Sequence, residues 1–176
     1  MIKNSEKQKY SEIEWANFFS QWLNSELGSD YKPFANEVEK SIVDIFLKSP
    51  SKKFTKLRLQ LTSGEPQIEY RYSAMMRKRP CSEREAISQN NSIADIDNAI
   101  FRKTKQSIEK YGESETNSTI LLVHGLLMEP PGENWFTDEF IEKHQQNSFA
   151  GIYYIRPFQE KVKQIKVPII IKNLVR

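Results

Sequence analysis

The pattern of apolar and polar positions begins with a helical period. Between Ser11 and Leu27, large apolar side chains recur every three or four residues, at Trp15, Phe18, Phe19, Trp22 and Leu23. This spacing predicts an amphipathic helix, and Gly28 is a typical residue for its end. Glu12 lies on or beside the apolar stripe. An acid there either faces the core side or, as an acid of the first turn, favours the helix dipole. We expect the second role, because acids are common at helix starts.

Two short runs of a different kind follow, Ile42–Leu47 and Leu57–Thr62, with a polar turn between them. Their β-branched, aliphatic and aromatic residues predict adjacent antiparallel strands. Asp44 falls inside the first run, and Gln60 alternates with leucines in the second. Buried polar groups are costly unless they are satisfied, so both positions require an explanation. An extended segment over residues 31–39 is expected before these strands, and Ile68–Tyr72 alternates like a further strand.

The second half of the chain mixes helical and strand patterns. Ser82–Glu85 forms a capping box that predicts a helix start, and Asn90–Ser92 is expected to interrupt that helix. A longer helix then presents an apolar face made of Ile96, Ile100, Thr104, Ile108 and Tyr111. Gly112 is expected to end it, and residues 113–117 are expected to form a polar loop.

Thr119–His124 is a continuous apolar run, as expected for a strand that is covered on both faces. Residues 125–134 read as a loop, and Thr137 is expected to cap a helix over Asp138–Gln146. Phe149–Ile155 predicts a last core strand that Pro157 stops. Ile169–Ile171 predicts an edge strand in the tail.

This order of elements predicts an α/β (mixed α+β) fold, with a central mixed β-sheet flanked by helices on both faces. Right-handed crossovers would place the 119–124 strand in the middle of the sheet. The 176 residues are expected to form a single domain over 1–176, with a core at about 11–157 and a C-terminal extension.

Composition adds modest constraints. The chain is 38% hydrophobic and 28% charged, with a net charge of +3, which is compatible with nucleic acid but does not argue for it alone. The single cysteine, Cys81, excludes an intrachain disulfide. No apolar signal-peptide core or membrane-length window is present, so a cytoplasmic protein without membrane partners is expected.

Several short patterns suggest chemistry. Arg71, Arg77, Lys78 and Arg79 form the densest basic patch and are candidates to bind nucleic-acid phosphates, although a charged strand edge explains them equally well. The His124-Gly125 turn is similar to an α/β-hydrolase oxyanion loop, but the Gly-x-Ser-x-Gly elbow is missing from the sequence. We therefore expect His124 to make a structural hydrogen bond. His144 has no evident ligand partner, which argues against zinc.

The element order resembles the restriction-endonuclease-like fold of the PD-(D/E)XK superfamily over roughly Ser11 to Pro157. The resemblance implies a helical Glu, a strand Asp and a Glu-x-Lys on the next strand, with the acids holding one or two Mg²⁺ ions. On this chain Glu12 and Asp44 match the acids, and they are the candidate metal ligands and catalytic residues. Arg58 and Gln60 occupy the Glu-x-Lys positions and complete the candidate catalytic set.

The substitutions at Arg58 and Gln60 favour a degenerate domain, because a cation repels Mg²⁺ and an amide lacks the lysine charge. The first hypothesis is therefore a non-cleaving nuclease-like protein of a mobile-element or defence setting, which binds DNA or a partner protein. The second is an active Mg²⁺-dependent endonuclease that uses Glu12, Asp44 and a migrated acid, with Glu37, Glu39 or Glu69 as candidates. The third is a non-enzymatic interaction domain, with a partner protein or a homodimer.

Overall fold

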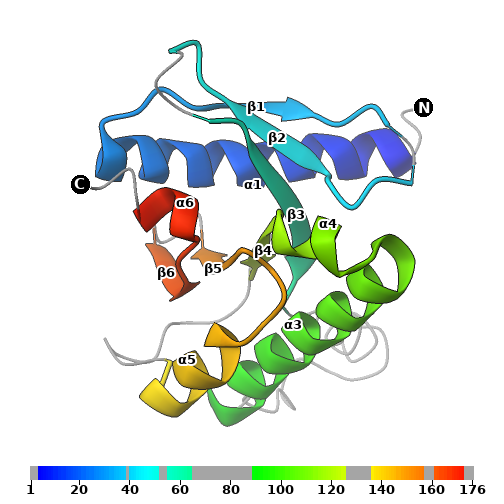
Figure 1. The fold of residues 1–176 in the computed structure, drawn as a ribbon, viewed down its shortest axis with the longest axis vertical. Helices are drawn as coiled ribbons and strands as arrows, with labels where there is room; N and C mark the ends of the chain where they lie inside the picture. Colours follow the sequence, from blue (N-terminus) through cyan, green and yellow to red (C-terminus); the bar gives the residue numbers. More distant parts are fainter. Residues whose placement is uncertain are drawn as a thin grey trace, which may run out of the picture.

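The computed structural model describes residues 4–38, 40–51, 55–64, 89–125, 136–156 and 161–172. The elements in chain order are α1 (Asn4–Leu27), β1 (Lys32–Ala35), β2 (Ile45–Lys48), β3 (Leu57–Ser63), α3 (Gln89–Tyr111), α4 (Glu113–Asn117), β4 (Ile120–His124), α5 (Asp138–Gln145), β5 (Gly151–Arg156), β6 (Lys161–Lys166) and α6 (Ile169–Lys172). Figure 1 shows them along the chain. Within this part of the chain, no helix is both long enough and apolar enough to span a bilayer.

The strands form one six-stranded sheet in the order β1-β2-β3-β4-β5-β6. The first three strands pair antiparallel as a meander. β4 is parallel to both β3 and β5, and β6 returns antiparallel to β5. The predicted mixed sheet is confirmed, and the 119–124 strand lies inside it as expected.

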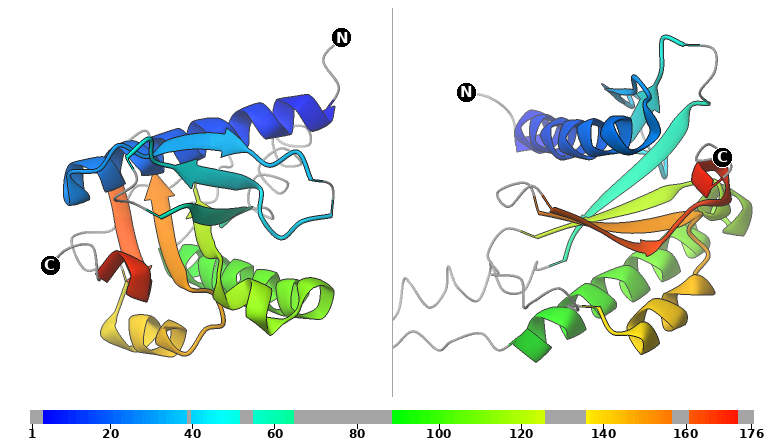
Figure 2. Two further views of the ribbon diagram at one scale, coloured as in Figure 1. Left: turned by 45° about the horizontal axis from the view of Figure 1, so that its top comes forward. Right: turned by 90° about the vertical axis from the view of Figure 1, so that its left-hand side faces the viewer.

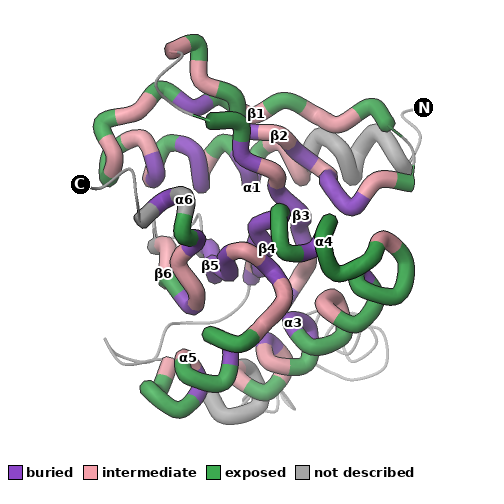
Figure 3. The backbone as a smooth tube through the Cα atoms, in the orientation of Figure 1, coloured by how far each residue is buried: buried purple, intermediate pink, exposed green. Residues whose placement is uncertain are grey.

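Helices cover both faces of the sheet, which Figure 2 shows most clearly in its right-hand view. The first core lies under α1, where Phe19 and Leu23 meet Leu59 and Leu122. The second lies under α3 and α5, where Ile96 and Phe140 meet Leu121 and Val123. β4 reads as a continuous apolar run because successive residues enter opposite cores. Figure 3 colours β4 as buried up to its last residue.

Helix ends follow the local sequence signals. Gly28 and Gly112 both have positive φ, +59° and +87°, a conformation that favours glycine after a helix. The Thr137 side chain accepts a hydrogen bond from the Phe140 N–H, which confirms the predicted cap of α5.

The structure corrects four sequence predictions. Residues 90–92 lie within α3 and do not interrupt it, and residues 113–117 form the short helix α4 and not a loop. Ile169–Ile171 belongs to α6, and the edge strand is β6. Asparagine propensity and apolar content are weak local signals, and tertiary packing overrides them. On α3, Ile108 of the expected apolar face is 36% exposed, because the buried stripe turns towards Ser107.

The predicted strand at 68–72, the capping box at 82–85 and most of the 125–134 loop lie outside the described residues.

Candidate functional site

Asp44 lies immediately before β2, at a local irregularity of the sheet. Its N–H donates to the Leu59 carbonyl at 2.9 Å, although the register places Ile45 opposite Leu59. Asp44 and Ile45 therefore both lie opposite Leu59, and two residues opposite one is the arrangement of a β-bulge. The Asp44 Oδ2 atom accepts a hydrogen bond from the Leu61 N–H at 2.8 Å. The carboxylate therefore takes the place of a backbone partner for this N–H of β3. The sequence placed Asp44 inside the strand, and the structure places it where the strand begins.

The environment of Asp44 is electrostatically unusual. The pKa of the Asp44 carboxyl is raised from 3.8 to about 6, mainly by burial and to a smaller extent by the negative charge of Glu12. The Leu61 N–H and the positive charge of Lys103 lower that pKa. Glu12 on α1 and Asp44 therefore lie close enough for their charges to interact. A carboxyl with a pKa near neutrality next to a second carboxylate is suited to proton transfer or to binding a cation.

The position of Glu12 on α1 excludes one of its two explanations. The helix begins at Asn4, two turns before Glu12, so this residue does not lie in the first turn. The helix-dipole interpretation therefore fails, because that effect falls off within the first turn. Glu12 is partly buried, and its charge acts on Asp44.

Arg58 and Gln60 engage different partners. Arg58 forms an ion pair with Glu115 of α4. Gln60 is only 4% exposed, and its Oε1 accepts the Ser107 Oγ–H of α3 at 2.8 Å. Alternate residues of a strand point to opposite faces, so these side chains leave the face on which Leu59 and Leu61 meet α1. In the structure the charge of Glu12 acts on Asp44, whereas Arg58 and Gln60 contact α4 and α3.

Sequence reasoning missed Lys103. It lies on α3, three residues after Ile100, and its charge acts on Asp44. Only the helical period gave a hint, because it placed Lys103 beside the apolar face of α3. The positive charge of Lys103 favours the ionised form of the Asp44 carboxyl.

His124 ends β4 and is held by stacking. Its ring lies 4.6 Å from the Trp15 ring at an interplanar angle of 15°. The sequence predicted a structural hydrogen bond, but Nδ1 is buried without a hydrogen-bond partner among the described residues. Burial lowers the pKa of His124 to about 4, so the ring is neutral near pH 7. Glu12 and Trp15 are three residues apart and share a face of α1, so the acid pair and His124 lie along the same side of that helix.

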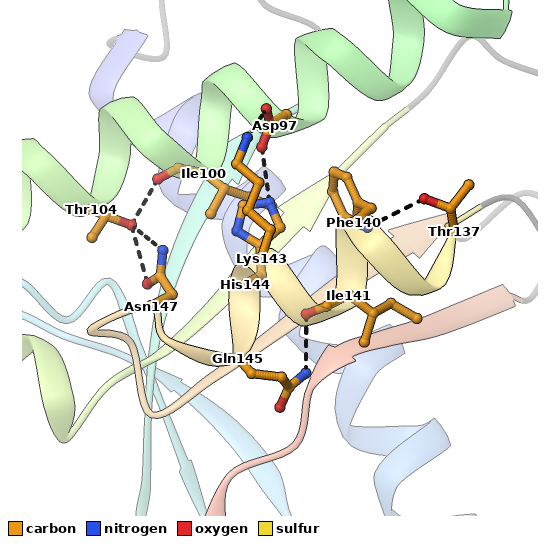
Figure 4. Close-up of polar contacts among 10 residues, drawn as sticks. All are labelled: Asp97, Ile100, Thr104, Thr137, Phe140, Ile141, Lys143, His144, Gln145 and Asn147. Carbon is orange, nitrogen blue, oxygen red and sulfur yellow. Dashed lines mark hydrogen bonds and ion pairs between the residues drawn. The ribbon is translucent and has the colours of Figure 1, made fainter.

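His144 belongs to a separate polar cluster between α3 and α5, which Figure 4 shows. Its Nε2 lies 2.9 Å from Asp97 Oδ1, and Lys143 Nζ lies 2.6 Å from Asp97 Oδ2. Burial lowers the pKa of His144, while the charge of Asp97 opposes that shift. Thr104 and Asn147 join the same two segments nearby, with Asn147 Nδ2 donating to Thr104 Oγ1 at 2.9 Å. These contacts connect α3 to α5 and to the residue Asn147 that follows it.

The possible ligands of a metal ion are few. No group of three or more His, Cys, Asp or Glu side chains in the described ranges is arranged to hold a metal ion. Glu12 and Asp44 remain a pair, which fits Mg²⁺ because this ion takes one or two carboxylates and keeps several waters. Glu37 is exposed in the loop after β1.

The other predicted site residues lie outside the described part of the chain, and their roles stay predictions. They are Glu39, Glu69, Arg71, Arg77, Lys78, Arg79 and the lone cysteine, Cys81.

Comparison with known proteins found no match to this chain among protein-family models, curated proteins or solved structures.

Proposed function

We propose that this chain is a DNA-binding domain of the PD-(D/E)XK nuclease type that does not cleave DNA. The observation that carries the proposal is that the charge of Glu12 acts on Asp44, just before β2, while Arg58 and Gln60 are bound to Glu115 and Ser107. The interaction between the charges of Glu12 and Asp44 supports this proposal, because the resemblance implies a pair of acids from a helix and a strand. At the positions where the resemblance expects Glu-x-Lys, Arg58 pairs with Glu115 and Gln60 accepts a hydrogen bond from Ser107.

The missing third position weakens a catalytic site for a physical reason. Two carboxylates give Mg²⁺ few protein ligands, and Asp44 Oδ2 already accepts the Leu61 N–H. Restoring an acid at position 58 would also remove the partner of Glu115. The DNA-binding part of the proposal comes from the net charge of +3 and from Arg71, Arg77, Lys78 and Arg79, whose side chains would neutralise phosphates.

A second candidate function is a Mg²⁺-dependent endonuclease, and the charges that act on Asp44 favour it. The negative charge of Glu12 and the positive charge of Lys103 both act on this carboxylate. Glu12 and Asp44 would hold the ion, which when bound activates water and stabilises developing charge on a phosphate. Lys103 would orient the phosphate by its charge.

One set of assays separates the two candidates. We expect the protein to bind labelled duplex DNA in fluorescence anisotropy, with affinity that falls steeply between about 50 and 200 mM salt. The combined substitutions Arg77→Ala, Lys78→Ala and Arg79→Ala should weaken this binding, whereas Arg102→Ala on the exposed side of α3 should not. Supercoiled plasmid should remain intact with Mg²⁺ or Mn²⁺.

Each other outcome has a defined meaning. Nicking that is lost in Asp44→Ala and in Glu12→Gln would establish the endonuclease and refute the non-cleaving proposal. Duplex binding that is absent, or that does not change with salt, would refute the DNA-binding proposal.

A further inference from the structure

One face of the sheet at β1 and β2 is open and carries aromatic and cationic side chains. Ile45 and Leu47 of β2 enter the core under α1, so the alternate residues of these strands project from the opposite face. Phe34 lies opposite Phe46, and Phe46 lies opposite Arg58, which makes a row across three strands. Figures 1 and 2 show α1 on one side of β1 and β2. On the other side the row is covered only in part, because Phe46 packs against the second core and Arg58 reaches Glu115 of α4, whereas Phe34 of β1 is exposed.

Lysines surround the two rings. We call this surface the basic–aromatic face, which consists of Lys32, Phe34, Phe46, Lys48, Lys56 and Arg58. Lys48 Nζ lies 4.9 Å from the centroid of the Phe34 ring, and Lys56 Nζ lies 3.3 Å from that of Phe46.

The charges of the basic–aromatic face are not balanced on the face itself. Lys32 and Lys48 are exposed and stand directly opposite each other in the register. Like charges at such a position destabilise a sheet. Arg58 is neutralised by Glu115 of α4, so the three lysines carry the positive charge. Phe34 is 45% exposed, which leaves a large apolar ring at the centre of a cationic surface.

We infer that the basic–aromatic face docks single-stranded DNA, an inference that rests on the DNA binding proposed above and specifies its form. Phosphates complement the three lysines, and bases complement the exposed ring of Phe34 and the part of the Phe46 ring that the second core leaves exposed. This combination of stacking rings and cations is how proteins hold single strands without reading sequence. A duplex offers its phosphates but keeps its bases stacked inside, so it gains only the electrostatic part.

The lysines that lie over the rings do not block this mode. The attraction of a lysine to a ring at an exposed site is weaker than the stacking of a base on that ring. A flexible lysine stem also lets the ammonium group move from the ring to a phosphate. Binding therefore exchanges two weak cation–π contacts for base stacking and ion pairs.

The test is anisotropy titration of the full chain with labelled oligothymidine and with duplex DNA. Phe34→Ala and Phe46→Leu should each weaken single-strand binding roughly 5-fold or more. Lys56→Gln should weaken it and reduce the slope of log affinity against log salt by about 0.7. Phe101→Ala and Arg102→Gln are matched controls, because both residues are exposed on α3, and they should leave the affinity unchanged. Thermal unfolding followed by circular dichroism checks that each variant folds, and Phe46→Leu preserves most of the packing volume.

The outcomes distinguish this inference from the proposed function. Duplex binding without preference for oligothymidine would overturn the single-strand inference and leave the proposed function standing. Oligothymidine binding that needs Phe34 and Lys56, without duplex binding, would support this face and refute duplex recognition. Unchanged affinity in Phe34→Ala and Phe46→Leu, or displacement by polyglutamate as effective as by DNA, would show a surface for acidic partners and overturn the inference.

Discussion

Replacing Asp44 by Asn removes the charge of the candidate site and keeps its shape. The Asn carbonyl can still accept the Leu61 N–H that Asp44 Oδ2 accepts at 2.8 Å. Repulsion between position 44 and Glu12 disappears, as does the cost of holding a charge away from water. We therefore expect Asp44→Asn to stabilise the protein near neutral pH.

The size and pH dependence of this gain follow from the pKa. Burial raises the pKa of Asp44 from 3.8 to about 6 in the folded state. Because the folded pKa is the higher one, the wild type loses stability as pH rises from 3.8 to about 6 and loses no more above that range. This difference corresponds to about 3 kcal/mol, which solvent screening reduces to about 1–3 kcal/mol at a partly exposed site. Near pH 4.5 the gain should be about 1 kcal/mol or less.

The measurement is urea unfolding followed by tryptophan fluorescence at about pH 4.5, 6 and 7.5. Glu142→Gln on the exposed side of α5 is the control, and its effect should be small at every pH. A destabilised Asp44→Asn protein at pH 7.5 would refute the reasoning. So would a gain of the same size at pH 4.5, because a cause other than the carboxylate charge would then be required.

Two further predictions concern His124 and Gln60. The folded pKa of His124, about 4, lies below the ordinary 6.5, so the stability of the wild type should fall as pH drops through that range. The variant His124→Phe keeps a ring to stack on Trp15 and should remove about 2 kcal/mol of that fall in urea unfolding. An unchanged pH profile of stability would contradict the low pKa of His124. Ser107→Ala should cost about 1–3 kcal/mol because it leaves the buried Gln60 oxygen without its donor. Adding Gln60→Leu to Ser107→Ala should recover part of that loss, and strictly additive effects in the double-mutant cycle would show that the two side chains do not interact.

Much of the fold follows from local patterns that need no tertiary information. The three-and-four spacing at Trp15, Phe19 and Leu23 determines the apolar face of α1, and Gly28 ends that helix because its φ is positive. The unbroken run over 119–124 predicted a strand covered on both faces, which β4 is. Errors occurred where the local signal was weak, at the start of α3, at α4 and at α6.

Some residues of the candidate site were also identifiable from the sequence, and others were not. The sequence identified Asp44 as a polar residue that required an explanation, because a lone carboxylate among apolar neighbours is visible in one dimension. It also offered Glu12, but it favoured the helix-dipole role, which the helix start at Asn4 excludes. The effect of Lys103 on Asp44 and the Trp15 stack on His124 could not be predicted, since each joins elements distant in the chain.

By itself, then, the sequence determined where chain segments would be helical or extended and which of their sides would be apolar, because these properties depend on spacing along one segment. Only the tertiary structure decided which side chains meet: Glu12 with Asp44, Arg58 with Glu115, Gln60 with Ser107, and Phe34 with Phe46 across an open face. These contacts depend on strand register and on where helices dock. A shift of one residue in register exchanges the two faces of a strand. The spacing of residues along the chain does not determine that register.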